Sequence, residues 1–204
     1  MKKHIDYERN VFINCPFDEE YDPLFYAILF AVHKCGFILR CSKEFDDSSG
    51  IRIKNIIQLI RESKYSIHDL SRVTLDGTAN LPRFNMPLEL GICIGAIEYG
   101  NKSQQENKYL IIESEKFRFK QFISDLSGQD IKDHKDSVEE AIRIIRNWLS
   151  KKTEEKIPSA SILIAEYQKF QDDLPALCFD EKWVPEELTY DEFANLAISW
   201  IALS

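Results

Sequence analysis

The chain has 204 residues, of which 44% are apolar and 29% are charged, so it has enough apolar material for a globular core. This composition excludes a disordered chain, a collagen-like chain and a small disulfide scaffold. The longest apolar run, residues 24–32, is too short to cross a bilayer, and the first residues lack the apolar region of a signal peptide. We therefore expect a cytoplasmic protein without a membrane partner.

The charge and the cysteine content exclude further classes of protein. The formal net charge is −8, and residues 153–204 alone hold 3 basic and 11 acidic side chains. No basic stripe of the kind that nucleic-acid binders carry is present, so no nucleic-acid partner is expected. The cysteine spacings match no common metal motif, so we expect no metal site and mostly buried free thiols. The cysteines are Cys15, Cys35, Cys41, Cys93 and Cys178.

Hydrophobic periodicity predicts strands that alternate with helices through the first 150 residues. This alternation indicates parallel βαβ units, and about five strands favour a flavodoxin-like three-layer α/β sheet. The predicted strands are residues 10–15, 37–41, 65–70, 109–113 and 129–132. The predicted helices are residues 23–36, 51–63, 87–99, 117–126 and 138–149.

The last quarter of the chain is acidic and rich in aromatic residues. Seven aromatic side chains in residues 153–204 indicate packed structure, and two helices are predicted, at 160–172 and 190–203. We therefore divide the chain into an α/β domain, residues 1–152, and a helical acidic C-terminal extension, residues 153–204. This extension either wraps the main domain or presents a surface to a partner.

Ligands of such sheets bind beside the carboxyl ends of the strands, which directs attention to the loops at residues 16–22, 42–50 and 71–85. These loops contain no glycine-rich dinucleotide fingerprint and no P-loop. The chain also lacks H-E-x-x-H and G-x-S-x-G. Dinucleotide-dependent redox chemistry, phosphoryl transfer and serine hydrolysis are therefore disfavoured.

Glu89 is the strongest catalytic candidate in the sequence. If Met86 caps the helix, Pro87 is its first residue and Glu89 its third, at the ligand edge of the sheet. A carboxylate there is expected to stay ionised and to stabilise a developing cation, as N-glycosidic cleavage requires. Nicotinamide leaves NAD as a neutral molecule without an acid, whereas a purine needs protonation. The alternative is a glutamate that only caps its helix.

Six further residues are candidates for substrate binding. Asp69 closes the third strand and either binds a ribose hydroxyl or caps a turn. Phe17 either stacks on a base or fills the core. Asp18, in the acidic loop after the first strand, either binds ribose or belongs to a solvated helix start. The full set is Asn14, Phe17, Asp18, Asp69, Arg83 and Asn85.

Short motifs within residues 10–150 resemble TIR domains of the superfamily that also holds the nucleoside 2-deoxyribosyltransferases. The sequence VFIN at residues 11–14, followed by Asp18, resembles the first strand and loop of TIR domains. Residues 62–67 (ESKYSI) with Leu70 and Ser71 resemble the TIR segment that leads into the third or fourth strand. The E-L-G at residues 89–91 resembles both the TIR catalytic-glutamate region and the transferase motif.

The chain also departs from both families. Deoxyribosyltransferases have D-G-T close before E-L-G, whereas Asp76-Gly77-Thr78 lies well upstream here. Asn14 or Phe17 stands in place of the transferase tyrosine, which weakens the transferase interpretation. In TIR domains a tryptophan and a cysteine usually precede the glutamate, and Phe84 and Asn85 take their places here.

The resemblance implies an NAD glycohydrolase or cyclase that acts in bacterial antiviral defence. Glu89 would stabilise the ribosyl cation, Phe17 would border the base and Asp69 would bind the ribose. NAD would be the substrate, with no cofactor required, and a homo-oligomer or a partner protein would complete the site. Two alternatives stay open: a non-catalytic nucleotide or ADP-ribose sensor that signals to a partner, and a nucleoside 2-deoxyribosyltransferase.

Overall fold

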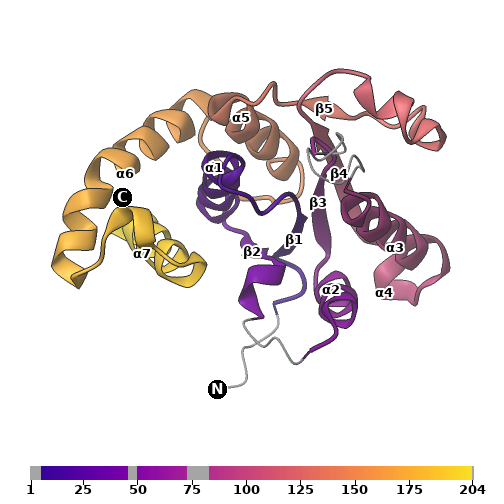
Figure 1. The fold of residues 1–204 in the computed structure, drawn as a ribbon, viewed down its shortest axis with the longest axis horizontal. Coiled ribbons are helices and arrows are strands. Elements are labelled where there is room, and N and C mark those ends of the chain that lie inside the picture. Colours follow the sequence, from indigo (N-terminus) through magenta and orange to yellow (C-terminus); the bar gives the residue numbers. More distant parts are fainter. Residues whose placement is uncertain (1–5, 46–49, 73–82, 204) are drawn as a thin grey trace.

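The computed structural model describes residues 6–45, 50–72 and 83–203. Over these residues the chain forms a five-stranded parallel sheet in the order β2-β1-β3-β4-β5 (Figure 1), which confirms the predicted flavodoxin-like three-layer α/β fold. The strands are β1 (Asn10–Asn14), β2 (Ile38–Arg40), β3 (Tyr65–Asp69), β4 (Lys108–Glu113) and β5 (Lys132–Asp133). The helices are α1 (Asp22–Lys34), α2 (Arg52–Arg61), α3 (Asn85–Tyr99), α4 (Lys102–Gln105), α5 (Val138–Leu149), α6 (Ala160–Glu181) and α7 (Tyr190–Leu203).

The two central strands, β1 and β3, are buried at every position. Successive side chains of a strand point to opposite faces, so each strand contributes to two cores. Val11 and Ile13 lie in the core with α1 and α5, and Phe12 lies in the core with α2 and α3. Helices therefore cover both faces of the sheet, and its two ends are left for the loops.

Residues 117–126 do not form the helix that the sequence predicts. They form two short 3-10 turns instead, Arg118–Gln121 and Ser124–Leu126. Phe117 has a left-handed backbone with φ 66°, and the N–H of Phe119 donates to Oε2 of Glu113 at 2.9 Å. Both features interrupt the regular i to i−4 bonding that an α-helix needs.

The acidic extension packs against the main domain through α1. Phe30 of α1 is fully buried, and its ring centroid lies 5.3 Å from that of Tyr167 and 5.5 Å from that of Phe170, both on α6. Trp200 of α7 joins the same group at 5.9 Å, and its indole N–H donates to Asp173 at 2.9 Å. The extension therefore wraps α1 and shares one continuous apolar core with the α/β domain.

Two predictions about the extension and the thiols can also be compared with the structure. Helix α6 begins at Ala160 as expected but continues to Glu181 through Pro175, because Leu174 and Cys178 remain buried on either side of the proline. All five cysteines are free and buried, as predicted. In the described ranges, no helix combines the length and the apolar character that a membrane span needs.

Candidate functional site

The candidate site lies at the carboxyl ends of β1 and β3. From there the chain enters α1 on one face of the sheet and α3 on the other, so the connections diverge between these two strands (Figure 1). Crevices at such switch points are the usual ligand sites of open α/β sheets. Asn14 ends β1 and pairs in register with His68, which precedes the last residue of β3.

Asn14 connects both strands to the start of α3. Its side chain is 2% exposed, and its Nδ2 donates to the carbonyl oxygen of Met86 at 2.8 Å and lies 3.0 Å from Nδ1 of His68. Burial lowers the pKa of His68 to about 3, so its ring is neutral and Nδ1 accepts the amide proton. The other ring nitrogen, Nε2, lies 3.1 Å from Oγ of Ser66 and donates to it. Asn14 therefore fixes the position of α3 relative to the sheet.

Asp69 is the centre of a fully buried polar network. Its Oδ1 accepts the backbone N–H of Ser71 at 2.7 Å and also the Ser71 hydroxyl. Its Oδ2 accepts the Tyr21 hydroxyl and lies 3.0 Å from Nε2 of His134. Four protein donors thus surround the carboxylate, which leaves no free acceptor for the ribose hydroxyl expected from the sequence. Asp69 instead joins the β1–α1 loop, the end of β3 and the loop after β5.

The ionisation of this network follows from its hydrogen bonds. Burial alone would raise the pKa of Asp69, but the hydrogen bonds and charge from His134, with the hydroxyl donors, lower it below its ordinary value. Burial alone would lower the pKa of His134, but the hydrogen bond and charge of Asp69 raise it. Sequence reasoning missed His134 and Tyr21, although His134 directly follows the short strand β5.

Ser71, His134 and Asp69 do not form a hydrolase triad. Oγ of Ser71 lies 2.9 Å from Nε2 of His134, and the Asp69 carboxylate approaches this same nitrogen. The opposite nitrogen, Nδ1, accepts the backbone N–H of Asp136 at 3.1 Å. A triad needs the serine and the carboxylate on opposite ring nitrogens. This arrangement therefore cannot relay a proton from the serine.

The structure corrects two expectations for Glu89, namely its position in the helix and its ionisation. Helix α3 begins at Asn85 with Phe84 as its N-cap residue, so Glu89 lies beyond the third helical position. Its side chain is only 5% exposed, and burial raises its pKa to about 7 against a smaller opposite effect of Arg52. The prediction of a first-turn glutamate that stays ionised is wrong, because α3 begins two residues earlier than expected and burial disfavours the charged form. Among the described residues, none hydrogen-bonds its carboxylate.

Glu89 lies close to the end of β1. Burial is the main cause that raises the pKa of the Cys15 thiol, and the charges of Asp69 and Glu89 both raise it further. Asp69 at the end of β3 and Glu89 on α3 therefore both lie near Cys15, the residue that follows β1. Cys15 itself is 2% exposed and stays protonated, so it is not a nucleophile.

Charged side chains of the loops lie at the outer edge of this end of the sheet, which we call the rim. Arg83 donates from Nη1 to Oδ2 of Asp18 at 2.9 Å, which joins the loop after β1 to the start of α3. Oδ1 of Asp18 accepts the N–H of Tyr21 at 3.1 Å. A second arginine, Arg72, contacts Glu20 at 2.8 Å. The structure thus brings Asp18 and Arg83 together as a pair.

The remaining two predicted residues have different surroundings. Phe17 is half-buried and packs edge-on against Phe25 of α1 with ring centroids 5.4 Å apart, and the Lys43 ammonium lies 5.3 Å from the Phe17 ring. Asn85 is exposed as the first residue of α3. Phe17 therefore belongs to the edge of the α1 core, and Asn85 to the solvent side of the rim.

Glu89 and the Asp18–Arg83 pair lie at this end of the sheet, and Asn14 is buried between them with its amide N–H groups bound to Met86 and His68. In the described part of the chain, no three histidine, cysteine, aspartate or glutamate side chains gather as a metal site requires. Comparisons of the chain with protein-family models, with curated protein sequences and with solved structures find no match.

Proposed function

We propose that the chain is a TIR-like enzyme that cleaves the nicotinamide–ribose bond of NAD, with Glu89 as its catalytic carboxylate. The observation that carries the proposal is the placement of Glu89, which is 5% exposed at the β1/β3 switch point and has a pKa raised to about 7. Buried carboxyl groups with shifted pKa values in a crevice are typical of catalytic sites. The E-L-G resemblance at residues 89–91 supports the same residue.

The chemistry needs Glu89 in its ionised form beside C1′ of the ribose. The C1′–N bond breaks, its electron pair leaves with nicotinamide, and the positive charge remains on the ribosyl group. A carboxylate in a desolvated site stabilises this charge more strongly than it would in water. Water then adds to C1′ and loses a proton, which gives ADP-ribose. Attack by an adenine nitrogen of the same molecule would give a cyclic product instead.

The rim residues complete the proposed site. The side chain of Arg83 is 41% exposed and offers a cation to the pyrophosphate, while Asp18 holds it by their ion pair. Asn14 positions α3, and therefore Glu89, through its bond to Met86. Phe17 borders the base, and Asn85 adds an exposed amide at the rim. A homo-oligomer or a partner that closes this site, and a role in antiviral defence, belong to the proposal through the resemblance alone.

One observation favours a second candidate function. A pKa of about 7 leaves about half of Glu89 protonated at neutral pH, so the residue can also act as an acid. A purine leaving group needs such an acid, so nucleoside 2-deoxyribosyl transfer is the alternative reaction. The two reactions require opposite protonation states of the same side chain.

The test is to incubate the purified full chain with NAD and to follow nicotinamide release by chromatography. Glu89→Gln should lower the release by about 100-fold, because the amide cannot carry the negative charge. Glu98→Gln, an exposed glutamate on the same helix, is the matched control and should keep full activity. Release that is equal in both variants would overturn the proposal. Absent release with retained binding of ADP-ribose would favour a nucleotide sensor.

A further inference from the structure

The edge of the sheet at β4 is only half covered. Strand β5 pairs with Ile112 and Glu113, and over the described residues no strand pairs with the earlier part of β4 on that side. The N–H of Lys108 donates to Lys64 toward β3, and the carbonyl of Glu113 accepts from His134 on the opposite side. Backbone groups alternate along a strand, so the N–H and C=O of Tyr109 face the open side.

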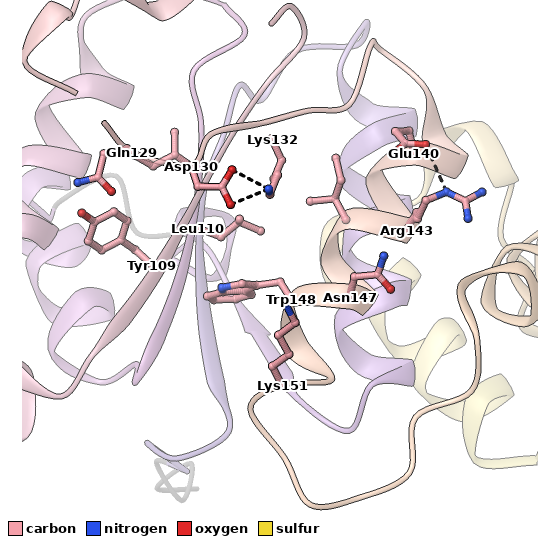
Figure 2. Close-up of a pocket in the computed structure, with 12 residues that line it drawn as sticks. Tyr109, Leu110, Gln129, Asp130, Lys132, Glu140, Arg143, Asn147, Trp148 and Lys151 are labelled. Atoms are coloured by element: carbon pink, nitrogen blue, oxygen red, sulfur yellow. Dashed lines mark hydrogen bonds and ion pairs between the residues drawn. The ribbon is translucent and has the colours of Figure 1, made fainter. Parts of the chain in front are cut away.

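A cavity of about 460 Å³ lies at this open edge (Figure 2). Three successive residues of β4, Tyr109, Leu110 and Ile111, line it, so the cavity runs along this part of the strand. Helix α5 forms one wall with Ile144 and the half-buried Trp148, and residues 129–132 form the other.

Charge is uneven along this cavity. Near β5, Lys132 is paired with Asp130 at 2.6 Å, and Arg143 of α5 is paired with Glu140 at 3.3 Å. Figure 2 shows both pairs at the same side of the cavity, with Lys151 at the other.

Three lysines lie around Trp148 at the amino end of β4. Lys108 pairs in register with Tyr65, whose ring centroid lies 5.9 Å from that of Trp148, and the Lys152 ammonium lies 5.7 Å from the Trp148 ring. Lys151 lines the cavity beside Trp148, and the charges of Lys108 and Lys151 both lower the pKa of Lys152. No acidic side chain among the described residues pairs with any of the three. Lys151 therefore brings positive charge to this end of the cavity, and Lys108 and Lys152 add to it from beside the cavity.

We propose that the open edge of β4 binds an extended acidic peptide of a partner protein as an added strand. Its backbone would bond to Tyr109, its apolar side chains would rest on Trp148 and Ile144, and its carboxylates would meet the lysine cluster of Lys108, Lys151 and Lys152. Strand addition draws its affinity from such edge bonds and its specificity from side-chain pockets. The positive charge of the lysine cluster favours an acidic partner.

The test uses a displayed library of random octapeptides, selected on the full chain. The expected result is an enriched set with alternating β-branched residues and with aspartate or glutamate at one end. The double variant Lys108→Glu, Lys151→Glu should weaken a selected peptide about tenfold in fluorescence anisotropy. Lys54→Glu, an exposed lysine on α2, is the control and should bind like the unaltered chain.

A second measurement tests the backbone pairing itself. N-methylation of every second residue of the selected peptide should abolish binding, whereas methylation of the intervening residues should not, because only alternate N–H groups face β4. Tyr109→Pro removes the strand's own edge donor and should also abolish binding, with circular dichroism to confirm its fold. The proposal is overturned if no peptide is enriched, if the enriched peptides are neutral or basic, or if both methylation patterns are tolerated. None of these readouts depends on the NAD activity.

Discussion

His134 donates from Nε2 to the carboxylate of Asp69 at 3.0 Å, and neither side chain is exposed to solvent. The two residues are 65 positions apart in the chain, at the end of β3 and just after β5. The pair therefore joins the centre of the sheet to its edge. A buried carboxylate is costly to leave without such a donor, because its charge then remains in the interior with one hydrogen bond fewer.

Removing the histidine should destabilise the fold strongly. His134→Leu leaves Asp69 without one of its donors and should lower the free energy of unfolding by about 1.5–3 kcal/mol. His134→Gln keeps an N–H donor near the position of Nε2 and should cost much less. Urea unfolding of both variants at pH 7 measures the difference. Equal losses in the two variants would mean that packing, rather than the hydrogen bond to Asp69, holds this region.

Neutralising Glu89 should stabilise the protein at alkaline pH. Burial raises its pKa from 4.5 to about 7, so the folded state binds this proton more tightly than the unfolded state. The resulting stabilisation is complete below pH 4.5 and is lost as the pH rises to about 7. Glu89→Gln should therefore raise the free energy of unfolding, measured with urea, at pH 8 by about 3 kcal/mol and leave it nearly unchanged at pH 4. Identical shifts at both pH values would argue against a buried, ionising Glu89.

The pH dependence of turnover separates the two candidate reactions. Nicotinamide release needs the carboxylate and should rise as the pH increases through about 7, the pKa of Glu89. Exchange of a purine base between nucleosides needs the acid and should fall over the same range. Initial rates with NAD and with a purine 2-deoxynucleoside, each measured between pH 5 and 9, provide the comparison. A rate with NAD that falls through pH 7 would contradict the proposed role of the carboxylate.

The extension should depend on a single buried ring of α1. Phe30 contacts aromatic side chains of both α6 and α7 and is 0% exposed. Phe30→Ala should cost about 3–5 kcal/mol and should weaken the near-ultraviolet circular dichroism of the tryptophans, because Trp200 loses a packing partner. Phe179→Ala on α6, where the ring is 82% exposed, is the control and should change neither signal. An unaltered spectrum in Phe30→Ala would show that the extension packs without this ring.

The sheet could be predicted because its signals are local. The runs NVFIN and YSIHD became central strands, as expected, and residues Val138, Ile142, Ile145 and Leu149 marked the apolar face of α5. The turns after β4 could not be predicted, because their cause is a bond from the Phe119 backbone to a buried carboxylate. The pattern of apolar residues gives no sign of a hydrogen bond between a loop backbone and a side chain.

The candidate site was predictable only in part, for a related reason. The sequence placed Glu89 at the ligand edge, but its protonation depends on where α3 begins and on how deeply the side chain is buried. The long-range partners of Asp69 come from Tyr21 in one loop and His134 in another, far apart in the sequence. Only the assembled sheet brings these groups together.

The four hydrogen bonds to Asp69 also determine at which stage of folding the buried network around this carboxylate forms. They come from residues 21, 71 and 134, so the carboxylate is fully satisfied only after the first helix and the last strand have both joined the sheet. A partly folded chain would hold a bare carboxylate in its interior, which is unfavourable. The formation of this site and the completion of the fold are therefore one cooperative event, and the Ser71 amide should exchange with deuterium only when the whole α/β unit opens.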